Sequence, residues 1–405
     1  MAASAFSLKD GLARLLRPGP DEVGAVTGLR ALSILWVLQQ HLHQGLRPLL
    51  LLPEGRVFLA HPLLRVGWAG NLGVEIFFVI SGWLIGGMLM REREETDRVA
   101  LGRFWLRRAM RILPAYLLAI GATLAIGDPN ARRAWANVLF VNDLLPFREQ
   151  FMSHAWSLAI EEQFYLVFPL FVLVVWRARP AWRTPLLVAT LAALALLAFA
   201  LTERYGLFLT RRPDTDPEAF WRYMDLFYVR PYTRAGSLVV GVIVARLERT
   251  GVVARLDGRP VVALLIGVVA LFVIGSVVFV FPEGLDDAGH RTLSGALGLS
   301  LGGYAFAAGV GALLAVARSR AAVGRALARV LGARLLHPIA QLSYAAYLFH
   351  PLCIALVLKL GFDVYRPWLS YPILLGLSFV TTFACAAVVH LGLELPIMKL
   401  RPPAR

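Results

Sequence analysis

Long apolar segments recur along the chain from residue 25 to residue 396, and this recurrence constrains the fold more than any other feature. About 20 predominantly apolar residues cross a bilayer as a helix. Because lipid offers no hydrogen-bond partner, the backbone of each crossing segment must bond within itself. The pattern predicts an all-α, polytopic membrane protein with about ten transmembrane helices around a cavity. The expected spans are 25–46, 66–90, 110–127, 154–176, 184–203, 228–246, 260–281, 292–316, 338–359 and 368–396.

Composition supports this class of protein. Of 405 residues, 58% are hydrophobic and 17% charged, whereas soluble domains have roughly 45–50% apolar and 25% charged residues. The net charge of +15 comes mostly from loops between spans, where basic residues set orientation and meet anionic headgroups. We therefore expect membrane lipids, and no nucleic acid, as partners. Cys353 and Cys385 fall in separate spans, so we expect no disulfide and no metal site.

The distribution of lysine and arginine predicts the orientation. With the N-terminus inside, the inner segments hold 25 of these residues and the outer loops 13. Basic residues favour the cytoplasmic side, so both termini are expected in the cytoplasm, as in a multi-pass protein of a bacterial inner membrane. Residues 1–24 have no small-residue cleavage site. They are interpreted as a cytoplasmic segment, 25–396 as one transmembrane domain and 397–405 as a cytoplasmic tail.

Arg30 and His41 lie eleven residues apart in the first span. Eleven residues make about three helical turns, so both side chains share one face about 16 Å apart along the axis. A cation suited to phosphate therefore lies three turns from a candidate base. The alternative is a snorkelling boundary arginine and a histidine satisfied in the core.

Glu75 lies within the second span, in the glycine-containing stretch 73–86. A carboxylate inside an apolar helix costs about 3 kcal/mol on insertion scales, so it needs a cation, a hydrogen-bond partner or water. Gly82 and Gly86 follow on the same face, where glycine allows close helix contact. A packing seam with Glu75 near the outer surface explains the same pattern.

Two further groups of charged and polar residues are candidates. Arginines at the start of the third span could grip a polyphosphate, although positive-inside topology also explains them. A polar stripe at the start of the fourth span must line a cavity or pair with other helices, and a hydrogen-bond ladder between helices is the alternative. The arginines are Arg107, Arg108 and Arg111, and the fourth-span residues are His154, Trp156, Ser157, Glu161, Glu162 and Tyr165.

Later spans add two more patterns. Arg230 and Arg234, one turn apart, could neutralise Glu161 or Glu162, or line a cleft for an acceptor. Ser343, Tyr347 and His350 share a face of the ninth span, a pattern that favours contacts between helices over chemistry. His43 and His390 have no evident partner.

Together these segments resemble the acyltransferase-3 family of membrane acyltransferases, which includes O-acetylases of bacterial surface polysaccharides. The resemblance covers nearly the whole chain. Its departures are Glu75, where the family often has aspartate, and the ending Phe349-His350-Pro351. The segments that carry it are Arg30 with His41, and residues 73–86, 107–111, 156–165, 343–350 and 394–396.

The resemblance implies transfer of an acyl group, acetyl being expected, from acyl-CoA to a hydroxyl of a glycan or glycosylated natural product. It makes Arg30 and His41 the functional pair. His41 would act as general base, or become acylated itself. We assign Arg30, Arg107, Arg108 and Arg111 to the coenzyme A phosphates, Glu75, Glu161 and Glu162 to orienting the imidazole, and His154, Trp156, Ser157, Tyr165, Arg230 and Arg234 to the substrate.

One other class of protein fits the pattern. Intramembrane glutamate and histidine also serve as proton relays in secondary transporters and in flippases of glycans or lipid-linked sugars. The arginines at one boundary favour a phosphate-bearing donor, and the two halves of the chain show no convincing repeat. Homo-oligomerisation is compatible with either function.

Overall fold

The structure, a computed structural model, describes residues 8–17, 19, 23–59, 61–207, 217–279 and 293–401. Across these ranges the chain is helical and has no β-strand. Parts of the expected terminal segments, 1–7 and 402–405, lie outside them. The long helices are α2 (Gly24–Gly45), α5 (Leu72–Thr96), α6 (Leu101–Ala125), α8 (Trp156–Val175), α9 (Pro180–Tyr205), α11 (Pro231–Arg249), α12 (Pro260–Phe279), α13 (Leu293–Arg318), α15 (Leu336–Leu358) and α16 (Pro367–Val389).

Short helices connect or extend the long ones. Those outside the expected spans include α3, α7, α10 and α14, whereas α4 and α17 extend α5 and α16. Prolines begin several of them, because the first helical position needs no N–H donor. The short helices are α1 (Leu8–Leu16), α3 (Pro53–Leu59), α4 (Pro62–Trp68), α7 (Ala134–Val138), α10 (Pro217–Tyr223), α14 (Ala322–Leu331) and α17 (Leu395–Lys399).

Each expected span coincides with one long helix, and eight spans in the described chain are long and apolar enough to cross a membrane. The fold is therefore an all-α, multi-pass membrane protein, as expected. Helices α2 and α11 are not among these eight; α2 carries Arg30, His41 and His43, and α11 carries Arg234, Arg246 and Arg249. Twelve residues of each are nevertheless buried. Their polar side chains meet protein, which can satisfy them as lipid cannot.

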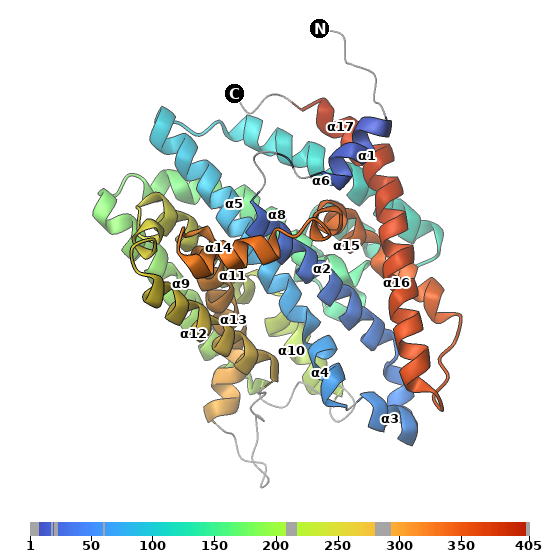
Figure 1. Ribbon diagram of the computed structural model, residues 1–405. Helices are drawn as coiled ribbons and strands as arrows, with labels where there is room; N and C mark the ends of the chain where they lie inside the picture. Colours follow the sequence, from blue (N-terminus) through green and yellow to red (C-terminus); the bar gives the residue numbers. More distant parts are fainter. Residues whose placement is uncertain are drawn as a thin grey trace. The chain divides into compact units, whose positions relative to one another are not determined.

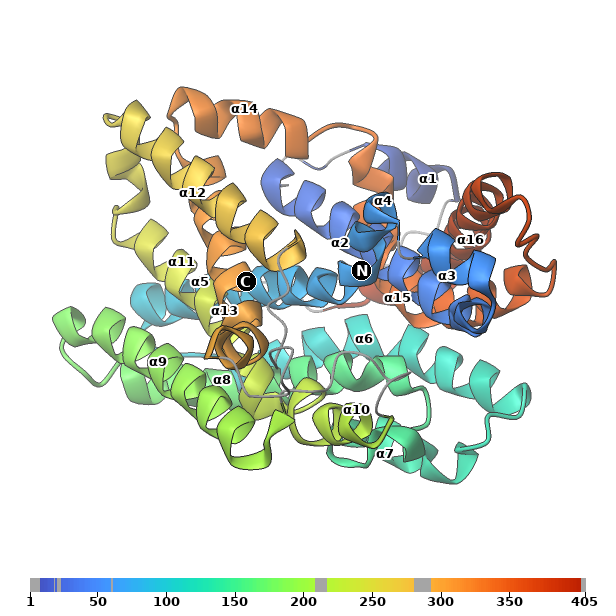
Figure 2. The same cartoon turned by 90° about the horizontal axis from the view of Figure 1, so that it is seen from below.

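The chain forms two compact units that interleave along the sequence. Unit 1 contains residues 1–74, 102–123 and 328–405, and unit 2 contains residues 75–101 and 124–327. In unit 1, α2 packs against α15 and α16 (Figure 1). In unit 2, α13 packs against α9, α11 and α12 (Figure 2).

Glycines set the closest helix approaches, as the stretch 73–86 predicted. A Cβ on Gly82 of α5 would collide with the carbonyl oxygen of Leu238 on α11, and one on Gly241 of α11 with the carbonyl oxygen of Val79. Each helix thus presents a glycine to the backbone of the other within unit 2. This contact brings Glu75, one end of α5, against α11.

Candidate functional site

Arg30 extends from α2 to α15 within unit 1. Its Nη2 donates to Ser343 Oγ at 3.0 Å. The next residue, Tyr344, donates its hydroxyl to the carbonyl oxygen of Ile112 on α6 at 2.8 Å. Ile112 directly follows Arg111, so adjacent residues of α15 hold Arg30 and the α6 backbone beside Arg111. Ser343 and Tyr344 of α15 therefore connect Arg30, one of the arginines expected to bind phosphate, to α6, which carries the other three.

The imidazole of His41 is oriented by its own helix. Its Nδ1 lies 2.9 Å from the carbonyl oxygen of Val37. A carbonyl only accepts hydrogen bonds, so Nδ1 carries the proton and Nε2 of the neutral ring keeps a lone pair. A backbone carbonyl four residues back thus orients the ring through Nδ1, and the role of Glu75, Glu161 or Glu162 in orienting the imidazole stays a prediction. The Nε2 atom thus has the protonation state that a general base requires.

His350 of α15 packs directly on His41. The ring centroids lie 4.4 Å apart with an interplanar angle of 75°, an edge-to-face arrangement. His350 is fully buried, and its Nδ1 bonds to the carbonyl oxygen of Tyr347 at 2.7 Å. The sequence favoured a contact between helices for this residue. The structure makes that contact with the candidate base itself, a pairing that separation along the chain hides.

Both members of the expected functional pair on α2, Arg30 and His41, therefore contact the same partner helix, α15. Ser343 meets Arg30 and His350 meets His41, in the same order along α15 as along α2. Ser343 and His350 are seven residues apart, about 10 Å along the helix. Arg30 and His41 are about 16 Å apart, and the long arginine side chain spans the difference.

A fourth arginine joins the three predicted on α6. Arg401 follows α17, and its guanidinium is close enough to Arg107, Arg108 and Arg111 to feel their charge. Burial, and then these three cations, lower the pKa of Arg401 to about 10. Arg401 was not predicted as a site residue from sequence, because basic residues of a terminal tail are expected on topological grounds alone.

A π-helical turn precedes Arg401. It runs from His390 to Glu394, between α16 and α17, and such turns are frequent at functional sites. His390 Nδ1 and Glu394 Oε2 are 2.5 Å apart, and both side chains are buried. His390, which had no evident partner from sequence, therefore has one. His43 also gains a partner, because its Nε2 lies 2.6 Å from the hydroxyl of Tyr371.

In unit 2, Glu75 meets a cation and a hydroxyl. Its carboxylate accepts hydrogen bonds from Arg234 and Ser237 of α11. Glu75 and Arg234 are almost fully buried, and the Arg234 guanidinium lies 5.7 Å from the ring centre of Trp156 and 4.3 Å from that of Tyr228. Of the two roles expected for Arg234, neutralising Glu161 or Glu162 is replaced by an ion pair with Glu75, whereas lining a cleft for an acceptor stays a prediction.

The polar stripe of the fourth span is divided between two elements. His154 lies in the 3-10 turn Ser153–Ala155, and α8 begins at Trp156 and carries the other members. Glu161 accepts hydrogen bonds from the hydroxyls of Ser81 and Tyr165. Ser157 is buried. Glu162, which directly follows Glu161 on α8, is half-buried. A carboxylate with two hydroxyl donors is a hydrogen-bond ladder, and also a site that can hold a hydroxylated ligand.

Arg230 supports a loop in unit 2. It donates to the carbonyl oxygens of Asp143, at 2.6 Å, and Asp225. Asp143 is fully buried, and its Oδ1 accepts a hydrogen bond from Gln163 at 2.8 Å. Burial raises the pKa of Asp143 to about 6, against the opposing effect of that hydrogen bond. The contacts of Arg230 are with backbone groups, which indicates a structural role.

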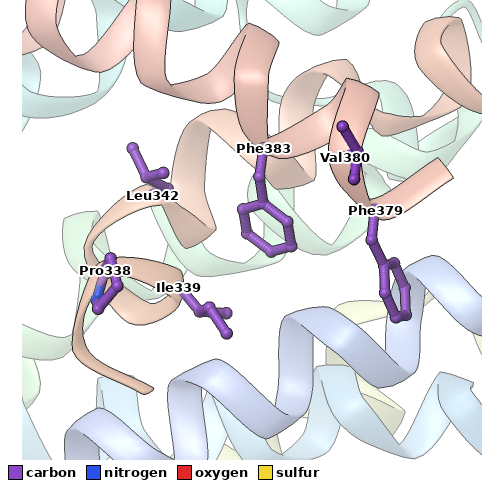
Figure 3. Close-up of a pocket in the computed structure, with 6 residues that line it drawn as sticks. All are labelled: Pro338, Ile339, Leu342, Phe379, Val380 and Phe383. Atoms are coloured by element: carbon purple, nitrogen blue, oxygen red, sulfur yellow. The ribbon is translucent and has the colours of Figure 1, made fainter. Parts of the chain in front are cut away.

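An apolar groove of about 280 Å³ lies between α15 and α16. Figure 3 shows its lining: Pro338, Ile339 and Leu342 from α15, and Phe379, Val380 and Phe383 from α16. Such a lining accommodates hydrocarbon and gives no donor to a phosphate. The groove is therefore distinct in chemistry from the arginine cluster.

Each unit thus gathers part of the expected site. Unit 1 holds the arginines assigned to the donor and the base, and unit 2 holds the carboxylates and the residues assigned to the substrate. Unit 1 contains Arg30, His41, Arg107, Arg108 and Arg111; unit 2 contains Glu75, His154, Trp156, Ser157, Glu161, Glu162, Tyr165, Arg230 and Arg234.

The fold and these side chains define a multi-pass membrane protein with a histidine held by its own helix and a group of neighbouring arginines. The chain belongs to the acyltransferase-3 family, whose model, described as an acyltransferase domain, matches residues 23–390. All of the predicted site residues fall inside the match, whereas Arg401, which was not predicted, falls outside it.

Two curated relatives carry related names. The peptidoglycan O-acetyltransferase OatA of Listeria monocytogenes is 30% identical over 256 residues, which cover 57% of this chain and 35% of the relative. The O-acetyltransferase OatA of Staphylococcus aureus is 33% identical over 173 residues, covering 38% and 25%. The matches thus span about a quarter to a third of the length of these relatives. No solved structure matches the chain.

Proposed function

We propose that this protein transfers an acyl group, acetyl being expected, from acyl-CoA to a hydroxyl of a glycan. The family membership and the O-acetyltransferase names of the relatives support the reaction class. The observation that carries the proposal is the pairing of α2 with α15. One end of the pair bonds Arg30 beside the arginine-bearing helix α6, and the other holds His41 against His350.

The chemistry follows from the orientation of His41. Its Nδ1 proton is committed to Val37, so Nε2 accepts the proton of the acceptor hydroxyl as the oxygen attacks the thioester carbonyl. A C–O bond forms, the C–S bond breaks, and the proton passes to the departing coenzyme A thiolate. The products are an ester and free coenzyme A. A positioned base contributes roughly 10² to 10⁴ in rate.

The donor is assigned by charge. Guanidinium groups bind phosphate through paired hydrogen bonds, and Arg30, Arg107, Arg108 and Arg111 belong to one unit. Their expected location at the cytoplasmic boundary suits a donor made in the cytoplasm. The long pantetheine arm would carry the thioester along α15 toward His41. On the acceptor side we assign Trp156, Ser157, Tyr165 and Glu161, which supply hydroxyl and carboxylate groups and an aromatic face.

Transfer of isotope tests the function. Purified protein in detergent or proteoliposomes receives acetyl-CoA labelled in the acetyl group, together with peptidoglycan fragments or other glycans. We expect label in an alkali-labile ester on the glycan and stoichiometric free thiol. Movement of a glycan across vesicles without covalent change would favour the transporter and overturn the proposal.

A further inference from the structure

Two guanidinium groups of unit 2 lie against the indole of Trp176, which directly follows α8. The guanidinium carbon of Arg183 is 5.1 Å from the ring centre, and that of Arg246 is 5.8 Å from it. Arg183 is held in place by hydrogen bonds to the carbonyl oxygens of Trp176, at 3.1 Å, and Ala178, at 3.3 Å. Trp176 and Arg246 are both more than nine-tenths buried. Side chains from the end of α8, the start of α9 and the end of α11 thus meet at one place.

Two N–H groups at this place have no acceptor. Nε of Arg246 and Nε1 of Trp176 are shielded from solvent and make no hydrogen bond to any residue that the structure describes. Both groups can only donate, and a buried donor without an acceptor costs free energy. An acceptor between the two side chains would remove this cost.

The charges around Arg246 specify the kind of acceptor. Arg246 Nη1 donates to Glu94 Oε1 at 3.2 Å, and Arg249 Nε donates to Glu94 Oε2 at 2.8 Å, so two arginines share one carboxylate. Arg183 and Arg249 are also close enough to Arg246 to repel its charge. Three arginines and one glutamate leave a formal charge of +2. Excess positive charge together with unmatched donors favours an anion that accepts several hydrogen bonds.

We propose that Trp176, Arg183, Arg246 and Arg249 form a binding site for a phosphoryl group, to which Trp176 Nε1 and Arg246 Nε donate. These residues lie at span ends that are expected on the cytoplasmic side, where topology accounts for their charge but not for the two buried donors. Two sources of a phosphoryl group reach this boundary, an anionic phospholipid and soluble phosphate. The site is independent of the proposed acyl transfer, because none of its residues is assigned to the donor or the acceptor.

Replacing Trp176 tests the site with the loss of a single N–H. Purified full-length protein, freed of copurified lipid by detergent exchange, is titrated with sodium phosphate and with short-chain phosphatidylglycerol by calorimetry at constant ionic strength. Trp176→Phe keeps an aromatic face for both arginines. A hydrogen bond to a charged group corresponds to a factor of roughly 10 to 100 in affinity, so we expect the Kd to rise by that factor. The Tm without ligand should not fall, because the lost N–H has no partner in the described chain.

Trp83 provides a matched control in the same unit. Its ring also lies near a guanidinium, 5.6 Å from that of Arg318, but its Nε1 donates to Glu248 Oε2 at 3.1 Å. Trp83→Phe should therefore lower the Tm without ligand and leave the Kd unchanged, the opposite of the result expected for Trp176→Phe. Wild-type affinity in folded Trp176→Phe, or no binding of either ligand by the wild type, would overturn the inference.

Arg246→Lys is a second variant that tests the guanidinium. It keeps the charge beside Glu94 but loses Nε and the planar fork. We expect weaker binding of the same ligand that Trp176→Phe weakens. Unchanged affinity in this variant would show that the charge alone attracts the anion and that the buried donors form no site.

Comparison of ligands distinguishes the two sources. Tighter binding of phosphatidylglycerol than of sodium phosphate, with weaker binding of phosphatidylcholine of the same chain length, would assign the site to an anionic headgroup. Equal or tighter binding of sodium phosphate would assign it to a soluble phosphate. Binding of phosphatidylglycerol that Trp176→Phe does not change would indicate lipid elsewhere on the surface and would contradict the proposed site.

Discussion

His41 and His350 come from helices about 300 residues apart in sequence and pack edge to face, with ring centroids 4.4 Å apart. Both rings donate Nδ1–H to a carbonyl of their own helix. Two backbone carbonyls thus fix two tautomers, and the candidate base acquires a neutral aromatic neighbour.

Replacing His41 tests the base. His41→Ala should lower the rate of acetyl transfer by roughly 10² to 10⁴ while the protein stays folded, because the lost group acts on the hydroxyl proton. The measurement is transfer of labelled acetyl to glycan per folded protein. His43→Gln is the matched control: it alters the buried contact with Tyr371, so it should lower the Tm and leave the rate per folded molecule nearly unchanged. Wild-type transfer by His41→Ala would refute the assignment.

His350 should act through His41. When His41 takes up a proton, its positive ring lies against the π system of His350, a contact worth about 0.5–2 kcal/mol. We expect His350→Gln to lower kcat by about 3- to 30-fold with the KM for acetyl-CoA unchanged, since Arg30 and the α6 arginines are untouched. Phe in the same position restores an aromatic face and should recover part of kcat. A rise in KM with constant kcat would contradict this role.

The contributions of Glu75 and Arg234 to the stability of the folded protein should depend on each other, because the two side chains form a buried ion pair. Removing one partner of a buried pair costs about 3–5 kcal/mol, because the other charge stays unpaired. Glu75→Gln and Arg234→Gln should therefore each lower the Tm strongly, and the double variant should be more stable than the sum of the two losses predicts. Thermal unfolding in detergent measures all three. Additive losses would show that the two residues are not coupled.

Asp143 should make stability depend on pH. Its pKa is about 3.8 when exposed and about 6 in the folded protein, because of burial. The folded state thus holds the proton more tightly, and this stabilisation is complete below about pH 4 and lost as the pH rises through about 6. The Tm of Asp143→Asn relative to wild type should therefore rise between pH 4 and 7 and then level off.

A second carboxylate provides the control for this profile. Glu218, in the same unit, is 78% exposed, and Glu218→Gln should give a Tm difference from wild type that hardly changes with pH. A flat profile for Asp143→Asn would show that the carboxylate is not perturbed by burial.

Much of the architecture could be predicted from local sequence. The ten apolar segments predicted the ten long helices because bilayer thickness fixes the length of a span, and Gly82 with its neighbours predicted a close helix contact. Helical periodicity placed Arg30 and His41 on one face, and the basic cluster Arg107–Arg111 on one helix.

Only the tertiary structure decided the partners. Arg234 pairs with Glu75, Ser343 with Arg30 and His350 with His41, each across a long stretch of chain, and helical periodicity states which face a residue occupies but not which helix meets it. Packing between distant segments likewise brings Arg401 close to the arginines of α6. The sequence determined which segments are helical and which spans carry charged residues, because these depend on the local order of apolar and polar residues. Packing between distant helices determined which charges and rings come together.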